Sequence, residues 1–80
     1  MRVRLRFFAS LRERLGSEAE SSVATGSTVG EVWATLVRAH PAIEAVRVRF
    51  AVNEEYVDAD HQLADGDELA IFPPLSGGQA

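Results

Sequence analysis

The sequence predicts an α+β fold in which one helix packs on one face of a mixed β-sheet. Residues 2–8 and 46–52 alternate between apolar and polar side chains, as strands with one buried face do. Residues 29–37 instead repeat their apolar side chains with helical spacing. The helix and the sheet must share one core, because neither can bury its apolar face alone.

The chain begins with two predicted strands joined by a short helical turn. Residues 2–8 form the stronger strand, and Phe8 lies in its outward phase together with arginines. Residues 10–15 fit a helical turn. Residues 18–24 predict a weaker strand, because few of them are apolar.

The long helix has clear start and stop signals. Thr28 and Glu31 have the spacing of a capping box, in which both side chains accept hydrogen bonds from backbone N–H groups. Trp33 shares the apolar stripe, so we expect it in the core. His40 precedes Pro41, which disfavours helical conformation in the residue before it and ends the helix.

Further strands follow the helix. A turn at residues 53–55 joins residues 46–52 to a brief return strand at residues 56–57. The Asp-Gly-Asp turn at residues 65–67 precedes the last strand, residues 68–72. Strands on both sides of one long helix predict a ubiquitin-like β-grasp with about five strands, in which the first and last strands are parallel neighbours.

The length of 80 residues corresponds to one domain. We assign residues 1–74 to the β-grasp domain and residues 75–80 to a flexible carboxyl-terminal tail. Pro73 and Pro74 separate the two, because proline lacks the N–H group that a sheet ladder requires. The tail contains a glycine pair without a returning strand to explain it as a hairpin turn. A tip without Cβ atoms fits a narrow channel in another protein.

The composition excludes several kinds of chemistry. The chain has no cysteine, hence no disulfide, thiolate metal ligand or thiol nucleophile. Its basic residues are all arginine, so it has no side-chain amine for Schiff-base chemistry. The net charge of −4 disfavours nucleic acid and favours a basic protein partner. The acidic residues of the carboxyl half either form a solvated face or, because they are near the tail, contact a basic activating enzyme.

The amino-terminal residues do not form a continuous apolar run, and no stretch of about 18 apolar residues occurs anywhere. We therefore expect a cytoplasmic protein with no signal peptide and no contact with a membrane.

Three segments form a recognisable set of motifs: Val-Arg-Leu-Arg-Phe-Phe-Ala at residues 3–9, Ala-Val-Asn at residues 51–53, and residues 63–78. The last segment is the most specific, since it combines the Asp-Gly-Asp-Glu turn, an apolar strand and the pattern F-P-P-x-x-G-G. Together they resemble the small, sulfur-carrying subunits of molybdopterin synthase, and the resemblance covers nearly the whole chain.

This resemblance implies a β-grasp fold and a defined role for the tail. In the family, a partner activating enzyme uses ATP to adenylate the carboxylate of the final glycine. Sulfur supplied by a sulfurtransferase then replaces AMP and gives a thiocarboxylate. The large subunit of the synthase receives this tail and transfers the sulfur to cyclic pyranopterin monophosphate. By resemblance, Gly78 holds the sulfur and Gly77 keeps the tip narrow, while the chain binds no cofactor and is not an enzyme on its own.

The sequence departs from the family at its end, because Gln79 and Ala80 follow the second glycine. Gly78 then forms a peptide bond and has no free carboxylate to adenylate. We expect either a precursor from which a hydrolase removes Gln79-Ala80, or a terminus altered for expression.

The phases of the aromatic residues predict a docking surface near the tail. Phe8 faces outward, Phe72 is out of phase with its buried neighbours, and Tyr56 lies on a brief strand that we place between them in the sheet. Grouped exposed aromatics mark interfaces, although they also fill small satellite cores. In the family, hydrophobic residues at these positions contact the large subunit and the activating enzyme. The expected partner-binding residues are Phe8, Tyr56, Phe72, Pro73, Pro74, Leu75 and Ser76.

No metal site is predicted. His40 and His61 have no companion at metal-ligand spacing. The aspartates between residues 58 and 67 lack the spacing of an EF-hand, so we interpret them as turn residues.

Two alternative functions stay open at this point. The first is a sulfur carrier related to ThiS, whose acceptor belongs to thiazole or cysteine synthesis. The second is a non-covalent β-grasp interaction module whose tail is never activated.

Overall fold

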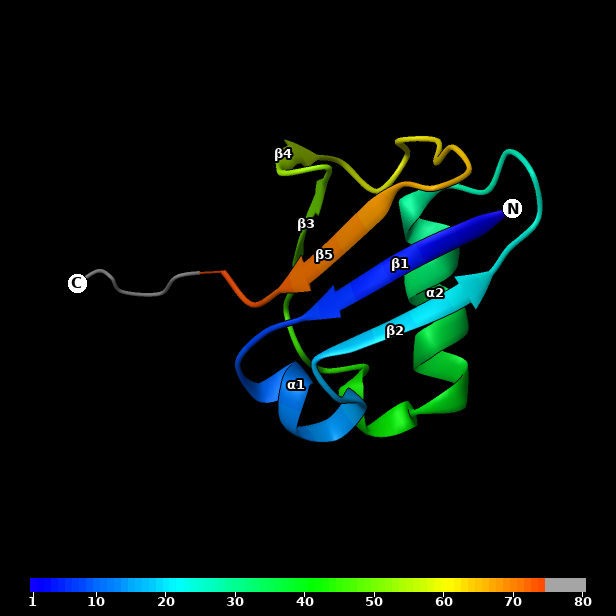
Figure 1. Cartoon of the computed structure of the whole chain (residues 1–80). Helices are drawn as coiled ribbons and strands as arrows, with labels where there is room; N and C mark the ends of the chain where they lie inside the picture. The colour runs from blue at the N-terminus through cyan, green and yellow to red at the C-terminus, as the bar shows by residue number, and fades with distance from the viewer. Residues whose placement is uncertain (75–80) are drawn as a thin grey trace.

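The computed structural model describes residues 1–74, and these form two layers, a five-stranded sheet and a helix that covers one of its faces (Figure 1). Along the chain the elements are β1 (Arg2–Phe7), α1 (Ser10–Leu15), β2 (Glu18–Ser22), α2 (Val29–Ala39), a 3₁₀ helix (Pro41–Ile43), β3 (Arg49–Val52), β4 (Glu55–Val57) and β5 (Glu68–Phe72). The helix on the sheet is α2, as the periodicity of residues 29–37 predicts. The tail assigned to residues 75–80 lies outside the described residues.

The strand order in the sheet is β2-β1-β5-β3-β4. The central strands β1 and β5 run parallel, with Leu5 opposite Leu69 and Phe7 opposite Ile71. The remaining neighbours, β2 on β1, β3 on β5 and β4 on β3, are antiparallel. The first and last strands are therefore parallel neighbours, and the predicted β-grasp is confirmed.

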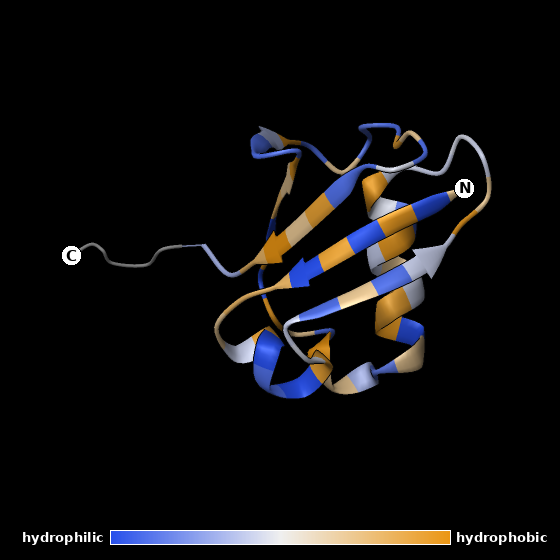
Figure 2. Ribbon diagram, viewed as in Figure 1, coloured by the Kyte–Doolittle hydropathy of each residue, from blue (hydrophilic) through white to orange (hydrophobic). Residues whose placement is uncertain are grey.

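Alternation along the strands places the core between the sheet and α2. Arg2, Arg4 and Arg6 lie on the open face of β1, while the residues between them are buried. Figure 2 shows this alternation as successive blue and orange segments along β1. The buried cluster consists of Val3, Leu5, Phe7, Leu11, Val29, Val32, Ile43, Val52, Leu63, Leu69 and Ile71. Its members come from both layers, as one shared core requires.

The helix α2 begins at the predicted capping box. The backbone N–H of Glu31 donates to the Thr28 hydroxyl at 3.2 Å, and the N–H of Thr28 donates to the Glu31 carboxylate at 2.8 Å. Trp33, expected in the core, is only partly buried and packs against its edge, with its ring 6.4 Å from that of Phe50. The helix ends before His40, as predicted, and the following 3₁₀ turn was not anticipated.

Strand boundaries differ from the predicted ones in three places. β1 ends at Phe7, not at Phe8, because the chain turns away at Ala9, whose φ is 54°. β2 ends at Ser22, two residues before the predicted end of the segment 18–24. β3 begins at Arg49, although the alternation starts at residue 46. Arg49 pairs with Phe72, so the next pair along this ladder would oppose Pro73, which has no N–H to donate.

Candidate functional site

The chain leaves the sheet at its centre. β5 is paired on both sides, by β1 up to Ile71 and by β3 up to its last residue, Phe72. Pro73 and Pro74 follow directly and are half-buried. Because the ends of parallel strands lie at the same edge of a sheet, the carboxyl ends of β1 and β5 are together at this edge (Figure 1). Leu75, Ser76, Gly77 and Gly78, predicted to bind partners or to hold sulfur, lie outside the described residues.

Three aromatic side chains meet where β5 ends, and we call them the aromatic cluster: Phe8, Tyr56 and Phe72. The Phe8 and Phe72 rings are edge to face, with centroids 6.4 Å apart and planes at 88°. The Tyr56 and Phe72 centroids are 5.8 Å apart, with planes at 50°. Tyr56 is 78% exposed, and the two phenylalanines are half-buried. The grouping inferred from the strand phases is therefore present in the fold.

The strand register explains this grouping. Phe72 follows buried Ile71 and so projects from the face of the sheet opposite α2. Tyr56 pairs with Ala51, whose small side chain leaves room for neighbouring rings on the same face. The expected order within the cluster is wrong, however. The sequence-based prediction has Tyr56 between the two phenylalanines, whereas the strand order β1-β5-β3-β4 places Phe72 in the middle.

Two arginines flank the aromatic cluster, and the sequence analysis did not assign them to the site. The Cζ atom of Arg6 lies 5.3 Å from the centre of the Phe8 ring, a distance typical of a cation–π contact. The Nη1 atom of Arg6 is also 3.8 Å from the Glu68 carboxylate. Arg49 is directly opposite Phe72 in the ladder and is exposed. Both arginines lie in the outward phase of their strands, β1 and β3, and this phase is the sequence feature that could have assigned them to the site.

The carboxylates of the turn before β5 and of the β3–β4 turn lie at the other end of the sheet, whereas Glu18, opposite Arg6, and Asp58, just after β4, lie toward the end where β5 stops. Asp65 and Asp67 precede β5, and Asp67 accepts hydrogen bonds from the Asn53 side chain at 2.9 Å and from the Ala64 N–H at 2.8 Å. The N–H of Asn53 donates to the Glu68 carbonyl at 2.9 Å, which holds the β3–β4 turn against the start of β5. These two turns therefore lie at the end of the sheet away from Phe72, and the contact of the acidic residues with a basic activating enzyme stays a prediction.

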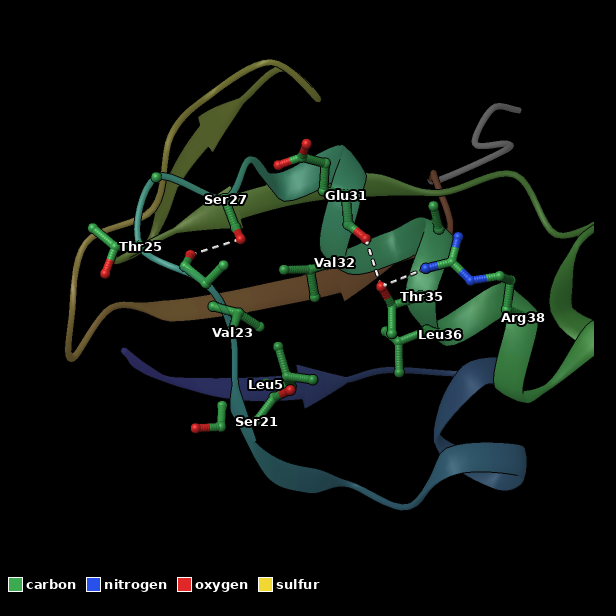
Figure 3. Close-up of a pocket in the computed structure, with 14 residues that line it drawn as sticks. Leu5, Ser21, Val23, Thr25, Ser27, Glu31, Val32, Thr35, Leu36 and Arg38 are labelled. Carbon is green, nitrogen blue, oxygen red and sulfur yellow. Dashed lines mark hydrogen bonds between the residues drawn. The ribbon is translucent and has the colours of Figure 1, made fainter.

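A separate groove of about 730 Å³ lies between β2 and α2 (Figure 3). Leu5, Val23, Val32 and Leu36 supply its apolar lining. Two of its hydroxyl groups bond to nearby backbone: Ser27 donates to the Ala24 carbonyl at 2.7 Å, and Thr35 donates to the Glu31 carbonyl at 3.0 Å.

Residues 1–74 contain neither a cluster of metal ligands nor a membrane-spanning helix. No three His, Asp or Glu side chains of this part of the chain gather closely enough to hold a metal ion. None of its helices combines the length and apolar character needed to cross a bilayer. The predicted turn role of Asp67 agrees with its hydrogen bonds to Asn53 and Ala64.

Known proteins are similar to this chain, and the similarity in sequence continues past residue 74 into the tail. The family model described as the ThiS family matches residues 5–78. A molybdopterin synthase sulfur carrier subunit from Chlamydomonas reinhardtii is 40% identical over 98% of this chain and 100% of its own length. The protein of the same description from Escherichia coli is 38% identical over 95% of this chain and 99% of its own length.

A solved structure has the same architecture. SAMP1 from Haloferax volcanii superposes with a TM-score of 0.81 and is 36% identical, covering 98% of this chain and 100% of its own. The similarity therefore includes the whole described domain, with its central β1 and β5 pair.

Proposed function

This chain belongs to the ThiS family, and we propose that it is the sulfur-carrier subunit of a molybdopterin synthase. One observation supports this function above the others. The family match continues past β5 through the glycine pair, and the aromatic cluster lies where β5 ends. A tail that leaves the sheet beside an exposed aromatic surface suits a protein that docks first and then delivers its terminus.

In this proposal the reacting group is the carboxylate of Gly78. An activating enzyme transfers AMP from ATP to this carboxylate and releases pyrophosphate, which makes the oxygen a good leaving group. A sulfur nucleophile, supplied by a sulfurtransferase, then displaces AMP, so that a C–S bond replaces the C–O bond. The resulting thiocarboxylate gives its sulfur to cyclic pyranopterin monophosphate in the large subunit. The carrier itself is a non-catalytic subunit that binds no cofactor, and ATP is used by its activating partner.

The proposed chemistry requires Gly78 to be freed from Gln79. Hydrolysis of the Gly78–Gln79 peptide bond by a hydrolase would release Gln79-Ala80 and create the required carboxylate. The intact mass of protein from its native host tests both steps. Loss of the two residues reports trimming, and a shift of about 16 Da reports replacement of oxygen by sulfur.

Activation is tested with two forms of the protein, one ending at Gly78 and one ending at Ala80. With the activating enzyme, we expect ATP–pyrophosphate exchange only for the form ending at Gly78. Exchange by neither form would contradict carrier function and favour a non-covalent interaction module. Conversion of cyclic pyranopterin monophosphate with a purified large subunit then identifies the acceptor. Exchange without pterin conversion would favour a carrier for thiazole or cysteine synthesis.

A further inference from the structure

The two ends of the sheet differ in charge. β1 and β5 run parallel and β3 runs antiparallel to them, so Arg6 near the end of β1 and Arg49 at the start of β3 lie at the edge where β5 ends. We call this edge the tail end. Further exposed arginines adjoin it in the chain, on α1 after β1 and before β3: Arg12, Arg14 and Arg47. The same region also has carboxylates, namely Glu13 on α1, Glu18 opposite Arg6 and Asp58 after β4.

The opposite edge is acidic. Asp65 and Asp67 form the turn that leads into β5, and the carboxyl-rich β3–β4 turn is bonded to the start of the same strand through Asn53. β5 has five residues, which corresponds to roughly 13 Å at the usual rise of a strand. The Debye length at physiological ionic strength is about 8 Å. A partner that contacts the tail end is therefore largely screened from the acidic edge.

The two arginines beside the aromatic cluster are available for contacts with a partner. Arg49 is exposed and has no carboxylate within salt-bridge distance among residues 1–74. Arg6 shares Glu68 with Arg4, at 3.8 and 3.9 Å, so two guanidinium groups compete for one carboxylate. Arginine next to aromatic rings is typical of the centres of protein interfaces, because its guanidinium is weakly hydrated and stacks on rings.

We infer that the aromatic cluster docks on an acidic protein surface, with carboxylates of the partner facing Arg6 and Arg49. This inference rests on the proposed carrier function and specifies the partner's contact chemistry. It reverses the expectation of a basic partner, which followed from the net charge of −4. The net charge sums over both ends of the sheet, whereas the local surface decides which partner fits.

Charge reversal at Arg49 tests the inference. The probe is the purified large subunit of molybdopterin synthase from the same organism, and binding is measured by surface plasmon resonance at low and high salt. We expect Arg49→Glu to weaken binding about tenfold or more, chiefly through slower association, and Arg49→Lys to retain most of the affinity. Arg2→Glu is the matched control, because it makes the same charge change on the same face but at the acidic edge. The wild-type affinity should fall as salt rises.

The outcomes separate the inference from the proposed function. If the wild-type protein binds and Arg49→Glu binds equally well or better, the inference is wrong and the carrier function stands. Equal losses for Arg49→Glu and Arg2→Glu would also overturn it, since they would report net charge only. If the wild-type protein does not bind the large subunit at all, the proposed function fails with it. Circular dichroism of each variant checks that the fold is kept.

Discussion

The rings of Phe8 and Phe72 meet edge to face, with their centroids 6.4 Å apart, although the two residues come from opposite ends of the domain's sequence. The parallel pairing of β1 and β5 brings them together. Edge-to-face pairs add about 0.5–1.5 kcal/mol beyond the apolar area that they bury. In this chain the exposed side chain of Tyr56 also packs against Phe72 of this pair.

Phe72→Ala removes the ring that joins the aromatic cluster. We expect binding to the large subunit to weaken by about tenfold or more, as at the central residues of interfaces. The loss of stability should be modest because Phe72 is only half-buried. Isothermal titration and thermal denaturation measure the two effects.

Phe50→Ala is the matched control, since Phe50 is also half-buried but packs with Trp33 on the helix side of the sheet. It should lower the melting temperature at least as much as Phe72→Ala while leaving binding nearly unchanged. Similar binding losses in both variants would mean that stability, and not the aromatic cluster, controls docking.

Asn53 connects the β3–β4 turn to the start of β5. Its side chain donates to Asp67 at 2.9 Å and accepts from the Glu68 N–H at 3.1 Å, and its φ of 50° is a conformation that asparagine tolerates better than alanine. We expect Asn53→Ala to cost about 1–3 kcal/mol of unfolding free energy, measured by urea denaturation.

Two further variants separate the causes at this turn. Asn53→Gly keeps the backbone conformation without the hydrogen bonds, so it should be less destabilising than Asn53→Ala. Adding Asp67→Ala to Asn53→Ala should cost less than the sum of the single changes, because both remove the same bond. Fully additive costs would show that the side-chain bond is not formed in solution.

Much of the fold could be predicted from local pattern, and several of the errors arise where strand pairing decides the outcome. The capping box of Thr28 and Glu31 and the alternation in β1 are local signals, and both are confirmed. Strand pairing is non-local. Val48 continues the alternation but would oppose Pro73, a fact that depends on register. The same dependence explains why the order within the aromatic cluster and the proximity of Arg49 to Phe72 could not be predicted before the strand order was known.

Thr28 starts the only long helix of the described domain. Thr28→Ala leaves the N–H of Glu31 without its hydroxyl partner, so we expect a loss of about 1 kcal/mol in unfolding free energy. Thr28→Ser keeps the acceptor and should be close to wild type. If the alanine and serine variants are equally stable, the capping bond contributes nothing measurable, and α2 depends on packing alone.

Gly30 lies where α2 closely approaches the loop before β5. A Cβ atom added there would lie 3.1 Å from the Ala59 carbonyl oxygen and 3.2 Å from the Ala59 Cβ. That oxygen already accepts the Gly30 N–H at 2.8 Å, so the loop cannot retreat without weakening this hydrogen bond. Alanine gains about 1 kcal/mol over glycine in a helix interior, and the crowding opposes this gain.

We expect crowding to prevail, so that Gly30→Ala lowers the melting temperature and Gly30→Val lowers it further. The control is Ala34→Gly, at an exposed position of the same helix, which reports the helix propensity difference without crowding. In an Ala59→Gly background, Gly30→Ala should become less harmful, since one of its two close contacts is gone. A Gly30→Ala protein that gains as much stability as Ala34→Gly loses would show that the loop moves freely, and the close approach of Gly30 to Ala59 would then not constrain this side of the fold.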